Sequence, residues 1–403
     1  MELKIADRYK NLAVAKEAKK IVQQCVHCGF CNATCPTYQL LGDELDGPRG
    51  RIYLMKSMLE GNAASRLTNK HLDRCLTCRA CETTCPSGVK YGRLLEIGRE
   101  IIKETRVRTL KSRLIRFLLR RTLVSTKVVR IMIFIAQPIK LVLSKRWEKH
   151  IPPYRLPNKT EDIKRSRYML LLDGCVQPAI APSINAIAKK VLNKAGISVL
   201  VQPSSGCCGA LSLHLDGTAE AKRLARKNID AWWPDVVNGC EAIVMTASGC
   251  GVTVREYGQL LVDDQDYSEK ALKVGSMVRD LSEVIASEKP SGLKWGDNRH
   301  VAFHSPCTLQ HGQRVNGLVE KILASNGWNI AGVKDQHMCC GSAGTYSFLQ
   351  SDIANNLREA KLVRLKENSP ELIASANLGC IMHLGKASDI PVVHWIELLA
   401  SVD

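Results

Sequence analysis

Apolar residues recur at helical spacing in three stretches of the first hundred residues. In residues 51–60 they stand at Ile52, Met55 and Leu59, which places them on one face of a helix. Residues 13–24 and 91–103 have the same periodicity. Runs of β-branched and aromatic residues that would favour strands do not occur here. The first hundred residues are therefore predicted to form an α-helical domain.

From residue 168 onward, short apolar runs alternate with longer stretches of helical periodicity. Five runs are predicted to be strands, at residues 168–173, 198–201, 242–246, 301–304 and 372–376. Four stretches are predicted to be helices, at residues 181–194, 219–231, 315–326 and 352–366. Strands that alternate with helices favour α/β units with parallel sheets.

The chain between these two regions is strongly basic. Residues 101–167 contain nineteen Lys or Arg and four Asp or Glu, which is +15 of the total net charge of +18. A helix here is amphipathic, with apolar side chains at Leu110, Leu114 and Leu118 and basic side chains at Arg113, Arg116 and Arg120. Such a helix suits an anionic membrane surface or the acidic face of a partner subunit, and both alternatives stay open.

The basic segment favours neither a membrane span nor a nucleic-acid site. Its longest apolar stretch, residues 128–143, contains Arg130, Pro138 and Lys140 and is shorter than the roughly 20 residues that a bilayer core requires. It has no helix-turn-helix, zinc-finger or stacking-aromatic pattern for reading bases. We therefore expect no nucleic-acid partner, and DNA binding is the alternative that charge alone suggests.

Two cysteine runs carry the clearest chemistry. Cys25, Cys28, Cys31 and Cys35 precede Pro36, and Cys75, Cys78, Cys81 and Cys85 precede Pro86 with the same spacing. This spacing is typical of two-cluster ferredoxins, in which the last cysteine of each run binds the other cluster. Two 4Fe-4S clusters are predicted. Their ligands are Cys25, Cys28, Cys31 and Cys85 for one cluster, and Cys75, Cys78, Cys81 and Cys35 for the other.

Other uses of these eight cysteines fit less well. A structural zinc ion needs four ligands rather than eight. The opening MELKIADRYK has no leader pattern, which predicts a cytoplasmic protein whose thiols stay reduced rather than a disulfide framework. Covalent haem requires a histidine directly after C-x-x-C, and no such motif occurs.

The C-terminal region contains an internal repeat marked by further cysteines. The first copy has Cys175, Cys207, Cys208 and Cys250, and the second has Cys307, Cys339, Cys340 and Cys380. Each pair is followed by glycine and lies 32 positions after the single cysteine. A duplicated domain is therefore predicted. Because ligands bind at the carboxyl ends of strands in open α/β sheets, the two cysteine pairs are expected to converge between the repeats.

The chemistry of these eight cysteines stays open at this stage. Soft thiolates select iron-sulfur clusters or zinc, so a possible third metal site is predicted, and a reactive thiol pair is the alternative. His311 and His383 are possible supplementary ligands. Cys240 has no counterpart in the second repeat and is interpreted as structural.

Together these features resemble a family of iron-sulfur electron-transfer subunits that combine a double ferredoxin motif with two Cys-Cys-Gly (CCG) domains. The family includes subunits of glycolate oxidase, anaerobic glycerol-3-phosphate dehydrogenase, lactate-utilisation complexes and heterodisulfide reductase, and the glycolate oxidase iron-sulfur subunits are the most similar. The resemblance covers nearly the whole chain. It rests on CVHCGFCNATCPTY at 25–38, GDELDGPRGRIY at 42–53, NIDAWWP at 228–234, CTLQH at 307–311 and CCGSAGTY at 339–346.

The resemblance implies a bacterial complex that oxidises glycolate to glyoxylate, with FAD on partner subunits and electrons passing to the membrane quinone pool. This chain would then lie at the inner face of the cell membrane. It has no dinucleotide fingerprint or nucleophile elbow, so neither a flavin nor a catalytic residue is expected on it. The same role for lactate or glycerol-3-phosphate is the alternative. The family pattern has one more cysteine per CCG unit, where this chain has Ala247 and Asn377.

The predicted fold class is therefore α+β and multidomain. An α-helical ferredoxin domain (residues 1–100) is followed by a basic amphipathic linker (101–167) and two duplicated α/β cysteine-rich units (168–298 and 299–403).

Overall fold

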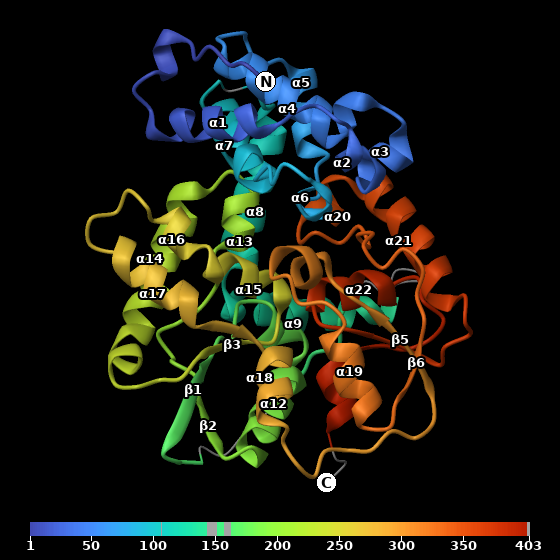
Figure 1. The fold of residues 1–403 in the computed structure, drawn as a ribbon. Helices are drawn as coiled ribbons and strands as arrows, with labels where there is room; N and C mark the ends of the chain where they lie inside the picture. The colour runs from blue at the N-terminus through green and yellow to red at the C-terminus, as the bar shows by residue number, and fades with distance from the viewer. Residues whose placement is uncertain (106, 143–150, 157–162, 401–403) are drawn as a thin grey trace.

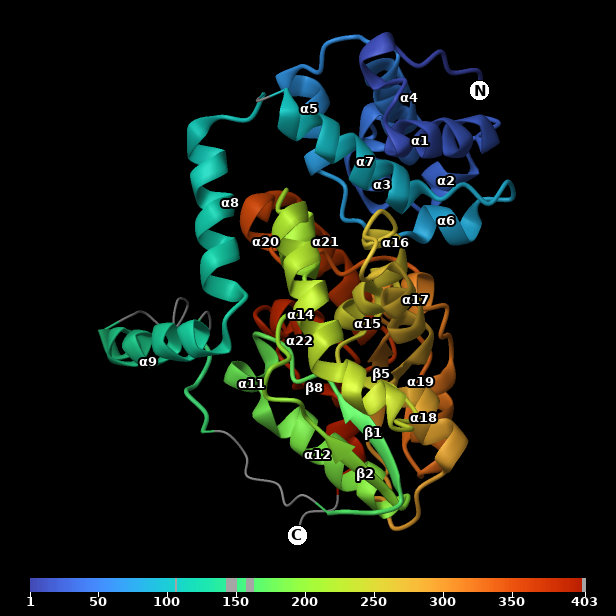
Figure 2. The ribbon, with the colours of Figure 1, turned by 90° about the vertical axis from the view of Figure 1, so that its left-hand side faces the viewer.

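The computed structural model describes residues 1–105, 107–142, 151–156 and 163–400. Helices of the N-terminal domain lie at one end of the molecule, and two α/β units lie side by side beneath them (Figure 1). Of the two helices of the basic segment, the first runs along one side and the second projects outward (Figure 2). The two CCG units follow the helical N-terminal domain, as the sequence predicts.

The N-terminal domain is helical throughout. Residues 1–105, all of which are described, contain no strand. Helices α1, α4 and α7 bury Ala18, Ile52, Met55 and Leu94 in its core. The elements are η1 (Asp7–Tyr9), α1 (Ala13–Gln24), α2 (Phe30–Ala33), α3 (Pro36–Leu41), η2 (Glu44–Asp46), α4 (Pro48–Leu59), α5 (Arg66–Asp73), α6 (Ala80–Thr84) and α7 (Tyr91–Glu104).

Each C-terminal unit is built on a four-stranded sheet in which every pairing is parallel. The first sheet has the order β2-β1-β3-β4 and the second has the order β6-β5-β7-β8. The strands are β1 (Arg167–Leu171), β2 (Ile197–Leu200), β3 (Ile243–Met245), β4 (Val278–Asp280), β5 (His300–His304), β6 (Asn329–Ala331), β7 (Leu372–Ser375) and β8 (Val392–His394). The matching orders confirm the predicted α/β class.

Helices cover both sheets, and one hydrophobic core joins the units. Leu171, Val244, Phe303 and Trp395 all belong to this core. The helices of the first unit are α11 (Gln177–Ile180), α12 (Pro182–Lys194), α13 (Ala210–His214), α14 (Thr218–Val237), α15 (Ser248–Arg255), α16 (Tyr257–Leu260), α17 (Ser268–Met277) and α18 (Leu281–Glu288). Those of the second are η3 (Thr308–Gly312), α19 (Leu318–Ser325), α20 (Tyr346–Leu349), α21 (Ser351–Lys366), α22 (Leu378–Gly385) and η4 (Trp395–Leu399).

The basic segment forms α8 (Leu110–Leu123) and α9 (Thr126–Val142), and α9 projects from the body of the molecule (Figure 2). Arg116, expected on the basic face that meets an external surface, is instead only 7% exposed and pairs with Asp73 and Asp216. Leu110 and Leu114 are 80% and 58% exposed. The helix therefore turns part of its basic face inward and its leucines outward.

Helix α9 also has exposed apolar side chains. Phe134 is 64% exposed, and Ile131 and Ile135 are also largely exposed, whereas Val129 and Ile133 pack against Ala179. Within the described part of the chain, no helix combines the length and the apolarity needed to cross a bilayer. The predicted apolar stretch ends at Leu143, which lies outside the described residues.

Candidate functional site

The first cysteine run closes around a small cavity. Two residues between its cysteines, His27 and Gly29, have left-handed backbone conformations with φ of 58° and 84°. These turns allow three cysteines separated by two residues each to face one point. Cys25, Cys28, Cys31 and Cys85 all line this cavity.

The second run repeats the geometry. Thr77 and Arg79 stand at the equivalent positions with φ of 56° and 62°, so the second loop makes the same left-handed turns without a glycine. The residues lining this second cavity include Cys75, Cys78, Cys81 and Cys35. Cys81 borders the first cavity as well, which makes the two cavities neighbours.

The structure thus places Cys35 beside the second run and Cys85 beside the first, the crossed arrangement expected from the spacing. The buried environment of other cysteines in the second run also suits a cationic iron-sulfur centre. Burial, followed by neighbouring thiols, raises the pKa of Cys78 and Cys81 well above the ordinary value. A bound cation would supply the positive charge that stabilises their thiolates.

The eight C-terminal cysteines share one cavity of about 510 Å³. Cys175 and Cys307 follow β1 and β5, while Cys250 and Cys380 lie in the first turns of α15 and α22, which follow β3 and β7. All of these positions are at the carboxyl ends of central strands, where ligand sites form in such sheets. The two cysteine pairs also line this cavity. Cys307 Sγ lies 3.9 Å from Cys339 Sγ.

Each Cys-Cys-Gly corner depends on its glycine. Gly209 and Gly341 have φ of 92° and 87°, and each backbone N–H donates to a cysteine Sγ two residues earlier at 3.5 Å. A Cβ at Gly341 would lie 2.5 Å from the carbonyl oxygen of Ala354. Only glycine therefore allows α21 to pack this closely against the corner.

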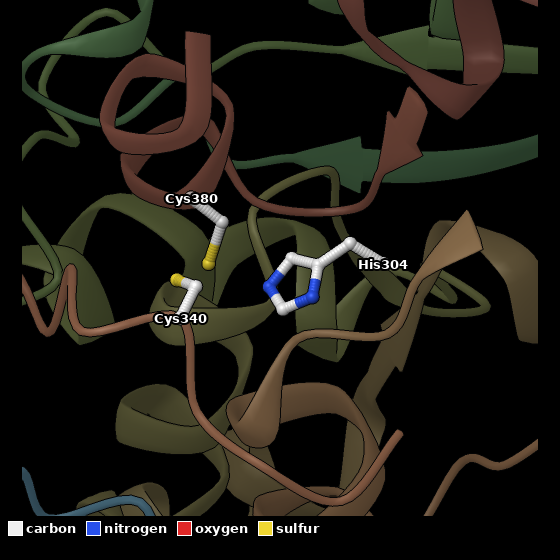
Figure 3. Close-up of side chains that lie close together, drawn as sticks. All are labelled: His304, Cys340 and Cys380. Carbon is white, nitrogen blue, oxygen red and sulfur yellow. The ribbon is translucent and has the colours of Figure 1, made fainter. Parts of the chain in front are cut away.

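The two histidines suggested as supplementary ligands have other partners. His311 contacts Thr83 Oγ1 at 2.9 Å and the carbonyl oxygen of His337 at 3.0 Å. His383 Nε2 contacts the carbonyl oxygen of Ala354 at 3.1 Å. A histidine that the sequence analysis missed, His304, instead lies beside Cys340 and Cys380 (Figure 3).

Comparison with known proteins agrees with this arrangement. Residues 21–89 match the family model of the 4Fe-4S dicluster domain, and residues 169–255 and 301–385 match that of the cysteine-rich domain. The chain is 46% identical to the glycolate oxidase iron-sulfur subunit of Escherichia coli (strain K12) over 99% of this chain and 98% of the relative. The chain belongs to the family of glycolate oxidase iron-sulfur subunits.

Two further comparisons extend the likeness. A probable glycolate oxidase iron-sulfur subunit of Bacillus subtilis (strain 168) is 29% identical, with 93% of this chain and 92% of the relative covered. The crystal structure of a hypothetical protein from Helicobacter pylori shares the fold, with a TM-score of 0.57 and 11% identity over 97% of this chain and 72% of that one. As a member of this family, the chain is an iron-sulfur protein of the 4Fe-4S type with a repeated CCG domain.

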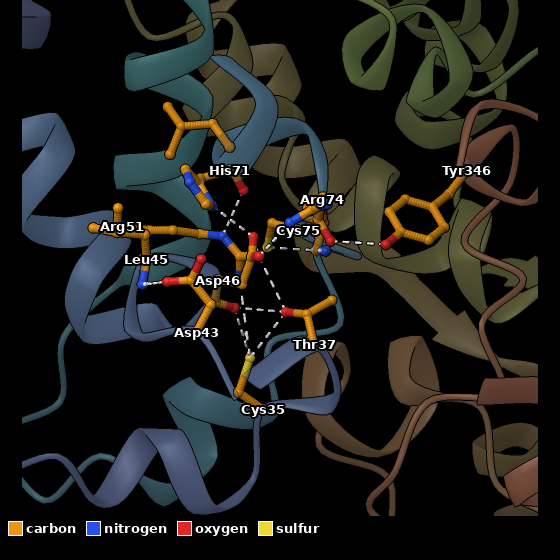
Figure 4. Close-up of polar contacts among 12 residues, drawn as sticks. Cys35, Thr37, Asp43, Leu45, Asp46, Arg51, His71, Arg74, Cys75 and Tyr346 are labelled. Carbon is orange, nitrogen blue, oxygen red and sulfur yellow. Dashed lines mark hydrogen bonds and ion pairs between the residues drawn. The ribbon is translucent and has the colours of Figure 1, made fainter. Parts of the chain in front are cut away.

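Buried polar groups lie beside two cysteines of the second cavity, Cys35 and Cys75 (Figure 4). Thr37 Oγ1 lies 3.3 Å from Cys35 Sγ, and a guanidinium nitrogen of Arg51 lies 4.0 Å from the same sulfur. On the other side, the hydroxyl of Tyr91 donates to Cys75 Sγ at 3.6 Å. Hydrogen bonds and charges near cluster sulfurs set reduction potentials, so these groups can tune a cluster held here.

A buried carboxylate holds this polar group together. Asp46, which is fully buried, accepts from Arg74 at 2.6 Å and lies 3.0 Å from His71 Nδ1. It also pairs with Arg51 at 3.4 Å. The Asp46 carboxylate thereby offsets part of the positive charge of Arg51 and Arg74 and helps to hold the Arg51 guanidinium beside Cys35.

The N-terminal domain also packs directly against both CCG units. Leu76 and Cys78 share a hydrophobic cluster with Cys339 and Tyr346 of the second unit, and the Tyr346 hydroxyl donates to the carbonyl of Arg74 at 2.8 Å. Arg79 pairs with Glu256 of the first unit. The second cavity therefore lies next to the large cavity, and Cys75 and Cys78 line both.

Proposed function

We propose that this chain is the electron-transfer subunit of a glycolate-oxidising complex. Two 4Fe-4S clusters would be held by Cys25, Cys28, Cys31 and Cys85, and by Cys75, Cys78, Cys81 and Cys35. When bound, they supply one-electron carriers that can accept electrons singly from a reduced flavin. The observation that supports this proposal is the row of three adjoining cavities, because adjoining sites keep electron carriers close together.

We further propose that glycolate is oxidised to glyoxylate on FAD-containing partner subunits. The printed name of the Escherichia coli relative, an iron-sulfur subunit of glycolate oxidase, supports both this substrate and a complex of several subunits. Our proposal places no substrate-oxidising site on this chain. Residues 1–100 would carry the clusters, 101–167 the contact with another surface, and 168–298 and 299–403 the CCG units.

The exposed side of α8 and α9 supports electron exit at a membrane, and we propose that it docks on the inner face of the cell membrane. Leucines and aromatic residues are exposed there, while Arg116 and Arg120 pair internally with acidic residues. Internal pairing also leaves less basic charge for nucleic acid. Val129, Met132 and Ile133 of α9 line the large cavity, so an apolar quinone could approach the second cluster from this side.

Three measurements test the cofactor, the partner and the substrate. Anaerobically purified chain should contain about eight irons and eight sulfides if two cubanes are present, and zinc without sulfide would refute the proposal. Co-expression with the proposed FAD-containing partner subunits should recover a flavoprotein that reduces a dye with glycolate. Dye reduction with lactate or glycerol phosphate alone would refute the proposed substrate.

The membrane contact is tested with anionic phospholipid vesicles in a flotation assay. Leu114→Glu and Phe134→Glu should each reduce the bound fraction, because each places a charge on the apolar face. Val363→Glu is the matched control, since Val363 is also exposed but belongs to α21 rather than to α8 or α9. If the three variants float equally with the vesicles, α8 and α9 do not form the contact.

A further inference from the structure

His304 is a buried side chain whose polar atoms have no protein partner. It ends β5 and is 1% exposed, and neither ring nitrogen has a hydrogen-bond partner among the described residues. Leaving a buried polar group unsatisfied costs about 1–3 kcal/mol. Such a histidine is expected where a ligand completes the site.

The two nearest sulfurs point to the identity of that ligand. One ring nitrogen of His304 and the Sγ atoms of Cys340 and Cys380 all lie within 4.8 Å of one another (Figure 3). Four-coordinate zinc, with bonds of about 2.0–2.3 Å, holds its ligand atoms roughly 3.5–3.8 Å apart. Small side-chain movements would close the site around one ion. Thiolates bound to different irons of a cubane need a wider separation.

We propose that the second CCG unit binds a single thiophilic divalent metal ion, best matched by zinc, through His304, Cys340 and Cys380. Cys339, whose thiol neighbours that of Cys340, can provide a fourth ligand. Two thiolates and an imidazole are a set that favours zinc over hard cations such as magnesium or calcium. Burial also keeps this imidazole neutral, the form that binds metals.

The internal repeat argues that this site belongs to the second unit alone. Cys175 corresponds to Cys307, and Leu172, three residues before Cys175, corresponds to His304. Leu172 is buried in an apolar cluster. The first unit thus offers cysteines only, whereas the second adds an imidazole at the carboxyl end of the equivalent strand.

A second difference between the repeats lies beside the same site. Asn377 Nδ2 donates to Cys380 Sγ at 3.5 Å, and the corresponding position in the first unit is Ala247. A hydrogen bond of this kind orients a ligand and stabilises its thiolate. The two differences described, His304 in place of leucine and Asn377 in place of alanine, therefore both favour a bound metal ion in the second unit. The proposal does not depend on the identity of the substrate oxidised by the partner subunits.

The test compares His304→Leu with His383→Leu in the full-length chain. Leucine reproduces the residue present in the first unit, and His383 is another buried histidine of the second unit, which contacts a backbone carbonyl. Anaerobically purified protein is analysed for zinc, iron and sulfide. Wild type and His383→Leu should carry one zinc per chain in addition to cluster iron, and His304→Leu should lose it.

Cobalt substitution supplies a spectroscopic readout. Co²⁺ bound to the zinc-depleted wild-type chain should give thiolate charge-transfer bands and intense tetrahedral d–d bands, which His304→Leu lacks. His304→Cys should restore binding with a stronger charge-transfer band, because a third thiolate replaces the imidazole. EPR spectra of the N-terminal clusters check that each variant is folded, and they test the proposed electron-transfer role separately.

Two results would overturn the proposal. One is an equal zinc or cobalt content in wild type and His304→Leu. The other is about twelve irons and twelve sulfides per chain without a mononuclear ion, because this indicates a third cluster instead. In His304→Leu, the affinity for the ion should fall by more than the 10–100-fold that is typical for loss of an outer-shell partner.

Discussion

Replacing Tyr91 with phenylalanine removes a single hydrogen bond to a proposed cluster ligand. Tyr91 is 4% exposed at the start of α7, and its hydroxyl donates to Cys75 Sγ at 3.6 Å. Phenylalanine retains the ring and its packing. The change therefore isolates the effect of one O–H group on the second cluster.

The expected shift follows from the energy of that bond. A hydrogen bond to a charged group contributes about 1.5–3 kcal/mol. Reduction makes a cluster more negative, so the bond is stronger in the reduced state. If about half of its energy distinguishes the two states, the difference is roughly 0.8–1.5 kcal/mol, or about 35–65 mV for one electron. Tyr91→Phe should lower the potential by this amount.

An EPR-monitored redox titration of the full-length protein measures the potential directly. Tyr346→Phe is the matched control, because Tyr346 is also buried near this site but donates to the carbonyl of Arg74 rather than to a cysteine. Its cluster potential should stay within about 10 mV of wild type. An unchanged potential in Tyr91→Phe, or an equal shift in both variants, would refute the role of this hydrogen bond.

Two further predictions concern stability. Burial raises the pKa of Asp280 to about 6 in the folded protein. Protonation of Asp280 therefore stabilises the fold fully below about pH 4, and this contribution is lost as the pH rises through 6. Above pH 6, Asp280→Asn should be more stable than wild type by up to about 3 kcal/mol in chemical denaturation. Gly341→Ala should lose about 2–4 kcal/mol, because it combines a left-handed φ with overlap at Ala354. Gly209→Ala, whose Cβ would lie 3.3 Å from its nearest backbone atom, should lose only about 1–2 kcal/mol.

Each stability prediction has a clear contrary outcome. If wild type and Asp280→Asn have parallel stability curves from pH 4 to 8, protonation of Asp280 does not contribute to folding. If Gly341→Ala and Gly209→Ala lose equal stability, the close approach of Ala354 has no energetic consequence. The unfolding midpoint of each variant, measured in the same denaturant series, decides both questions.

Features that depend on the pattern within one short segment were the ones best predicted from the sequence. Residues 13–24 were expected to be helical and form α1 (Ala13–Gln24), because their apolar periodicity is complete within the segment. Strands β4, β6 and β8 were missed. Each has only three residues and lies at the edge of its sheet, so none produces an apolar run long enough to recognise.

The missed histidine has a different physical cause. His311 and His383, the two histidines offered as supplementary ligands, each follow a cysteine closely in sequence. His304 meets Cys340 and Cys380 only after β5 and β7 pair. Sequence proximity is a poor guide to metal ligands that come from different strands. A signal was nevertheless present, since alignment of the two repeats places His304 opposite Leu172.

The orientation of α8 could not be read from its periodicity, because a helical pattern defines two faces without saying which one the protein buries. The outcome depends on Asp73 in α5 and Asp216 after α13, which provide buried partners for Arg108 and Arg116. Once these arginines face inward, the leucines on the other side must face outward. Exposing apolar side chains to water is unfavourable, and burying each large one against another surface contributes about 1.5–3 kcal/mol of free energy. The internal ion pairs thus hold α8 with its leucines outward, which is the orientation that the proposed membrane contact needs.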